Sequence, residues 1–101
     1  KEAQGFFPGY KSQFLLETDV KPFVMHLSSS EEGTRNGDNV GNYINHPRTT
    51  EIEERFLDRA PDATDHVAGS FLRWYDAHPE IQADDLVRIH RIGDEHFRLE
   101  L

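Results

Sequence analysis

Cysteine is absent from the sequence, and so is any long apolar run. Without cysteine the chain has no disulfide scaffold, no thiol nucleophile and no zinc site with cysteine ligands. No stretch approaches the roughly 18 consecutive apolar residues of a membrane span, and no charged and then apolar leader follows Lys1. We therefore expect a soluble, cytoplasmic protein with no membrane partner, whose fold is held by packing alone.

Positive charge is also scarce. The sequence has 11 Lys and Arg against 19 Asp and Glu, which gives a net charge of −8. A chain this acidic repels the phosphates of nucleic acid except where its positive charge is locally concentrated. The same acidity is typical of proteins adapted to high salt, so the net charge alone does not determine which kind of partner the chain binds.

The length of 101 residues allows one domain with one core, and we expect a single domain over 1–101. Apolar alternation predicts a strand over 21–27 and a brief strand over 40–44. Two further strands, over 86–92 and 96–101, flank a turn and predict a hairpin.

A three-residue turn in that hairpin places its apolar residues on one face, whereas a two-residue turn sets apolar residues against charged ones. We therefore predict the first register, with an exposed charged face on the other side. Its five pairs are Val87 with Leu101, Ile89 with Leu99, Arg91 with Phe97, Arg88 with Glu100 and His90 with Arg98.

Two helices are predicted between the second and third of these segments. Thr50 with Glu53 forms a capping-box pattern, which predicts a short helix to about Arg59. A second helix is predicted over 62–78, and its apolar residues at helical spacing are interpreted as core. They are Val67, Phe71, Trp74 and Tyr75. The order of elements predicts an α+β fold with a mainly antiparallel sheet.

Catalytic and metal-binding motifs are not found. The six histidines form no pair at the spacing of a helical metal site, and we interpret His78 as a cap of the second helix. No lysine follows Lys21, which removes the usual magnesium nuclease pattern, and no serine lies in a nucleophile elbow. We expect no metal, no cofactor and no enzyme activity; a small hydrolase that uses histidine and carboxylates is the weakest alternative.

The polar segment 28–42 is the most unusual part of the chain. It contains almost only Ser, Gly, Asn, Asp and Glu, with Thr34 and Arg35 among them. Structureless connections of this length are usually functional or disordered. The segment is therefore the first candidate for a binding site.

The residues from Leu27 to Ile44 resemble the opening motif of the N-terminal effector domain of EcoRII-type restriction endonucleases. Eight positions agree at fixed spacing: Leu27-Ser28-x4-Gly33-x3-Gly37-x2-Val40-Gly41-x-Tyr43-Ile44. The tail is similar to the last helix and hairpin of plant transcription-factor B-three domains, which share that fold. It reads Phe71-Leu72-x2-Tyr75, then Ala83-Asp84-Asp85-Leu86-Val87-Arg88-Ile89, then Phe97-Arg98-Leu99.

This resemblance implies an open, mainly antiparallel β-barrel, the DNA-binding pseudobarrel, with two helices and a C-terminal hairpin. It implies a sequence-specific module for double-stranded DNA that reads the major groove through an arm over 28–39 and leaves cleavage to another domain. The residues carried over as DNA contacts are Ser28, Thr34, Arg35, Asn36, Asp38 and Asn39. Arginine pairs with guanine and asparagine with adenine, whereas hydroxyls reach phosphates. Glu31, Glu32 and the net charge favour the alternative, a pseudobarrel that binds a protein partner and no DNA.

Overall fold

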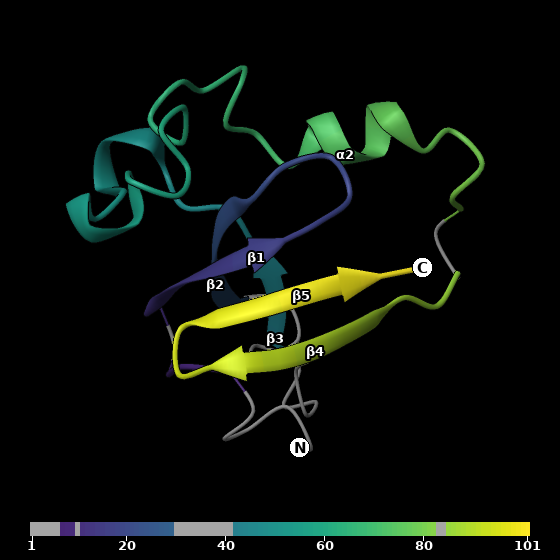
Figure 1. Cartoon of the computed structure of the whole chain (residues 1–101), viewed down its shortest axis with the longest axis horizontal. Helices are drawn as coiled ribbons and strands as arrows, with labels where there is room; N and C mark the ends of the chain where they lie inside the picture. Colours follow the sequence, from purple (N-terminus) through teal and green to yellow (C-terminus); the bar gives the residue numbers. More distant parts are fainter. Residues whose placement is uncertain (1–6, 10, 30–41, 83–84) are drawn as a thin grey trace.

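The computed structural model describes residues 7–9, 11–29, 42–82 and 85–101 (Figure 1). In chain order the elements are β1 (Gln13–Glu17), β2 (Phe23–Ser29), β3 (Asn42–Asn45), the 3-10 turns η1 (Thr49–Glu51) and η2 (Glu54–Phe56), α2 (Leu72–Ala77), β4 (Arg88–Gly93) and β5 (His96–Glu100). No helix within these residues is long and apolar enough to span a membrane.

The strands form one five-stranded sheet in the order β3-β2-β1-β5-β4 (Figure 1). The β1 and β5 strands are parallel, and the other three neighbouring pairs are antiparallel. The predicted α+β class with a mainly antiparallel sheet is confirmed. Among the described residues the sheet does not close into a barrel.

The central strand β1 was not predicted as part of the sheet. Its residues Phe14, Leu15 and Leu16 are all buried, because elements cover the sheet on both sides of this strand. A strand buried on both faces has no alternation of apolar and polar residues, and its sequence is then a short apolar run.

The hairpin register is confirmed for four of the five predicted pairs; Val87 does not pair with Leu101, because β4 begins only at Arg88, and the turn end also differs from the prediction. Gly93 pairs with His96, and a register shift lies between Arg91 and Gly93. The turn itself therefore consists of Asp94 and Glu95. Ile92 is the extra residue of a bulge between the pairs at Arg91 and Gly93, whereas the prediction had a turn of three residues and no bulge. At the other end β4 begins at Arg88, two residues later than predicted.

The two faces of the sheet carry separate clusters. The first, which we call the α2 face, packs Trp74 of α2 against aromatic and apolar side chains of the strands. Its buried members are Phe14, Leu16, Phe23, Met25, Trp74, Phe97 and Leu99. The second, the turn face, is covered by the segment that contains η1 and η2. Its buried members are Leu15, Val24, Phe56, Ala60 and Ala63.

The predicted helix over 50–59 is wrong: η1 and η2 replace it, and no side-chain cap forms at either. The reason lies in Gln13 of β1, whose amide reaches this segment from the sheet. Its Nε2 donates to the Glu51 carbonyl at 2.5 Å, and the Glu53 N–H donates to its Oε1 at 2.9 Å. These tertiary hydrogen bonds occupy the backbone groups that a helix would have used.

The second predicted helix is confirmed only for Leu72–Ala77. Trp74 is buried as predicted and Phe71 packs against the core, but Val67 and Tyr75 are 55% and 50% exposed, so their interpretation as core is wrong. The chain folds back on itself before α2: a Cβ at Gly69 would lie 2.6 Å from the Asp62 carbonyl oxygen. Only glycine permits this approach, which interrupts the predicted helix.

Candidate functional site

The predicted arm connects two neighbouring strands of the sheet. Ser29 of β2 pairs with Asn42 of β3, and residues 30–41 lie between them in sequence. The described residues on either side of 30–41, Ser29 and Asn42, are therefore neighbours on the sheet. Of the predicted DNA contacts only Ser28 is described; the others lie outside the described residues, and they are Thr34, Arg35, Asn36, Asp38 and Asn39.

Ser28 lies at the root of the arm next to a buried histidine. Its hydroxyl oxygen is 3.3 Å from Nε2 of His26, two residues earlier on β2. Side chains alternate along a strand, so His26 and Ser28 share the face of Val24, which belongs to the turn face. The hydroxyl and the imidazole therefore form one polar pair at this end of the turn face.

The pKa of His26 is lowered, first by burial and then by the positive charge of Lys11. His46 acts in the same direction, and Glu51 opposes them. The backbone also brings these residues near one another: the Lys11 N–H donates to the carbonyl of Leu27, the neighbour of His26, and His26 pairs with Asn45, the neighbour of His46. We call Lys11, His26, His46 and Ser28 the arm root.

Lys11 reaches the arm root through an unusual backbone conformation. Its φ is 68°, the only positive φ outside glycine among the described residues. Its N–H donates to the Leu27 carbonyl at 3.3 Å, which ties the segment before β1 to β2. A left-handed conformation is costly for a residue with a side chain, so this contact holds Lys11 in place.

The exposed face of the hairpin has a different electrostatic character. His90 contacts Glu100, with 3.0 Å between Nε2 and Oε1, and Arg98 lies 3.8 Å from a Glu17 carboxylate oxygen. Arg59 also contacts Glu17, at 3.1 Å. Glu17 is shared by Arg59, Arg98 and His96, so the two carboxylates only partly offset the basic groups of this face.

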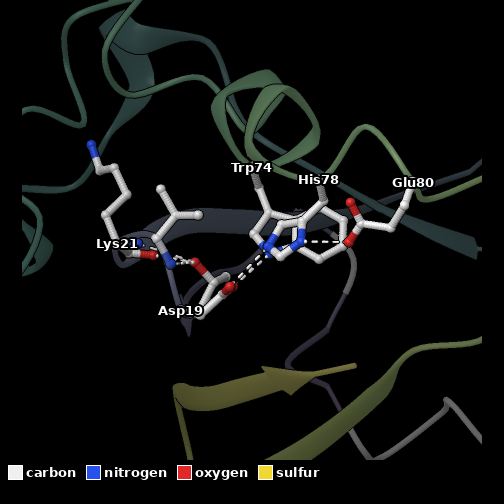
Figure 2. Close-up of polar contacts among 7 residues, drawn as sticks. Asp19, Lys21, Trp74, His78 and Glu80 are labelled. Carbon is white, nitrogen blue, oxygen red and sulfur yellow. Dashed lines mark hydrogen bonds and ion pairs between the residues drawn. The ribbon is translucent and has the colours of Figure 1, made fainter.

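A second polar cluster joins α2 to the turn between β1 and β2 (Figure 2). Asp19 accepts hydrogen bonds from Trp74 Nε1 at 3.0 Å and from His78 Nε2 at 2.8 Å. The other ring nitrogen of His78 lies 3.1 Å from Glu80. His78 is also the C-cap residue of α2, as predicted, and its N–H donates to the Tyr75 carbonyl.

The charges in this cluster support one another. The hydrogen bond to Glu80 raises the pKa of His78 despite partial desolvation, and Asp19 adds to the rise. Desolvation works against ionised Asp19, but its hydrogen bonds, from Trp74 first, leave its pKa lowered. Both ring nitrogens of His78 are engaged, so the cluster fastens α2 to the sheet and has no group left for proton transfer to a substrate.

No three histidine or acidic side chains gather as metal ligands within the described part of the chain. Sequence reasoning found Ser28 from the motif but missed Lys11, His26 and His46 as a group. Their spacing of fifteen and twenty residues carries no periodic signal.

Comparisons with known protein families, curated proteins and solved structures found no match to this chain.

Proposed function

We propose that the chain is a sequence-specific binding module for double-stranded DNA that reads the major groove through the arm over 28–39. The observation that carries the proposal is the position of Lys11 and His46 at the arm root, beside the paired strands β2 and β3 that the arm connects. In a chain with a net charge of −8, Lys11 brings positive charge to this place, where Glu51 also lies and where burial lowers the pKa of His26 and favours its neutral form. A segment that reads the major groove needs positive charge beside it, because the phosphates on either side of the groove are negatively charged.

The geometry of the sheet edges supports a pseudobarrel. Ile44 of β3 and Ile89 of β4, the two edge strands, line one groove of about 320 Å³ on the α2 face. In the view of Figure 1, β3 lies behind β5. An open barrel of this type is the fold that the resemblance to EcoRII-type effector domains implies, with any cleavage left to another domain.

Within the arm, Arg35 is the side chain proposed to pair with guanine, and Asn36 and Asn39 are proposed to pair with adenine. Arg35→Ala should weaken binding to the preferred site by roughly 1–3 kcal/mol, the range for a bidentate base contact. Arg73→Ala is the matched control, because Arg73 is an exposed arginine on α2 and should leave the affinity unchanged.

Selection from randomised duplex DNA at low salt and pH 6.5, followed by a salt titration, tests the proposal. Enrichment of one short motif with a steep salt dependence is expected. A selection that enriches nothing, with no retention of DNA at low salt, would contradict it.

A second candidate function is a pseudobarrel that binds a protein and no DNA. The observation in its favour is the apolar surface around the groove on the α2 face, where Leu72 is 64% exposed and Tyr75 is half exposed. If the DNA selection fails, Leu72→Gln and Tyr75→Ser in a pull-down with the purified chain would show whether a captured partner uses this surface.

A further inference from the structure

A cavity of about 260 Å³ lies on the turn face, between β2 and the segments on either side of η2. Its apolar lining consists of Val24, Pro47, Ile52 and Ala63. Its polar lining consists of His46, Arg48, Thr49, His66 and Ser70, with Gly69 completing the wall. His46 also belongs to the arm root, so the cavity adjoins the candidate DNA site.

The lining holds one arginine and two histidines, and the nearby Asp65 has its pKa lowered by the N–H groups of Ala68 and Val67 and to a lesser degree by His66. Arg48 and His66 are exposed, and neither forms an ion pair with a described residue. No acidic residue lines the cavity. Asp62 pairs with Lys21, and Asp65 accepts hydrogen bonds from the N–H groups of Val67 and Ala68.

Hydroxyl groups supply further donors. Ser70 is buried, and its oxygen accepts a hydrogen bond from the Leu72 N–H at 3.2 Å, which leaves the hydroxyl proton to donate. Thr49 contributes a second hydroxyl, and Arg48 offers a planar fork of N–H groups. Arginine, imidazole and hydroxyl donors together match the oxygens of a phosphate group.

We infer that this cavity binds a phosphate monoester. The phosphate oxygens contact Arg48, His46 and His66 at the rim, and the organic substituent covers the apolar floor formed by Val24, Ile52 and Ala63. The apolar floor lowers the local dielectric and strengthens the contacts at the rim. This inference goes beyond the proposed function, because reading base pairs in the major groove requires no monoester.

The direct test is calorimetric titration of the whole chain with phenyl phosphate, inorganic phosphate and phenol. Phenyl phosphate should bind about tenfold more tightly than inorganic phosphate, and phenol should not bind measurably. Arg48→Gln should weaken phenyl phosphate binding about tenfold or more, since a charge-assisted hydrogen bond is lost. Arg73→Gln, also an exposed arginine but outside the cavity lining, should bind within about twofold of the natural chain.

Two outcomes would overturn the inference: no binding of phenyl phosphate at millimolar concentration, or equal binding by Arg48→Gln and the natural chain. Both arginines are exposed, so thermal unfolding should show the same midpoint for both variants and exclude misfolding as a cause. His66→Gln provides a second cavity variant with the same expected direction.

The phosphate monoester can belong to a small molecule or to the end of a nucleic acid strand, and a duplex with or without a 5′-phosphate separates these sources. Tighter binding of the phosphorylated duplex, lost in Arg48→Gln, identifies a strand end. Equal binding of both duplexes, with phenyl phosphate still bound, identifies a small molecule. A failed DNA selection with phenyl phosphate bound contradicts the proposed function and leaves this inference intact.

Discussion

The two faces of the sheet are packed with side chains of different size. On the α2 face, Phe14, Phe23, Phe97 and Trp74 fill the space between helix and strands. On the turn face, Ala60 and Ala63 pack with Leu15 and Val24, and Ala63 and Val24 also line the cavity that contains Arg48 and two histidines. Large buried aromatic side chains contribute more to stability than small ones. The α2 face therefore contributes most of the buried aromatic packing and borders the groove of the second candidate function, whereas the turn face carries the cavity and the arm root.

Removing an aromatic side chain from the α2 face should have the largest effect. Phe97 is fully buried, with its ring about 5 Å from the rings of Phe7 and Phe14. Phe97→Ala should lower the free energy of unfolding by about 3–5 kcal/mol through lost burial and a new cavity. Urea unfolding measures it, and Leu57→Ala, at a half-buried position on the turn face, should cost less than half as much. Equal losses would remove the distinction between the faces.

The turn face depends on Gln13 for its attachment. Gln13→Leu keeps the volume but leaves the Glu51 carbonyl and the Glu53 N–H without their partner, and should lower stability by about 1–3 kcal/mol. Hydrogen exchange at the Glu53 amide should accelerate at the same time. Ser12→Ala, at an exposed neighbouring position, serves as the control. Unchanged stability and unchanged exchange in Gln13→Leu would show that η1 and η2 form without the hydrogen bonds of Gln13.

The polar cluster at the end of α2 predicts a pH dependence. The raised pKa of His78 stabilises the fold fully below its ordinary value of 6.5, and that contribution is lost as the pH rises through the folded pKa. The lowered pKa values of Asp19 and Glu80 contribute above their ordinary values of 3.8 and 4.5 and are lost on acidification. The cluster should therefore stabilise most between pH 4.5 and 6.5.

Thermal unfolding from pH 4 to pH 9 checks this profile. In the natural chain the unfolding midpoint should decline above pH 6.5 as His78 loses its proton. In His78→Gln this decline should be smaller, because the titrating group has been removed. His90→Gln is the control, since His90 is an exposed histidine on the hairpin that also contacts a carboxylate. A profile for His78→Gln that matches the natural chain would refute the assignment.

The smallest effect is expected at Val67, which helical spacing assigned to the core. Because the side chain is more than half exposed, Val67→Ser should change the free energy of unfolding by no more than about 0.5 kcal/mol. Urea unfolding of this variant distinguishes the turns seen before α2 from a continuous helix. A loss above about 1.5 kcal/mol would mean that Val67 packs inside the protein.

Local sequence patterns predicted the strands that have one exposed face. They gave wrong secondary structure where contacts between residues distant in sequence determine the backbone conformation. The alternation of Arg88, Ile89 and His90 fixed the hairpin register, because one face of that hairpin meets water. The capping-box residues Thr50 and Glu53 predicted a helix that Gln13, some forty residues away in sequence, prevents. The arm root was predicted only at Ser28, since Lys11, His26 and His46 meet through the sheet.

The most direct test of the central claim is a map of amide shift changes when the selected duplex is added to the isotope-labelled chain. The account predicts that changes concentrate in the arm and at the arm root, at Arg35, Asn36, Lys11, Ser28 and His46, while amides of α2 and β4 stay unchanged. Changes centred on α2 or on the hairpin would contradict the account, because DNA would then bind away from the arm.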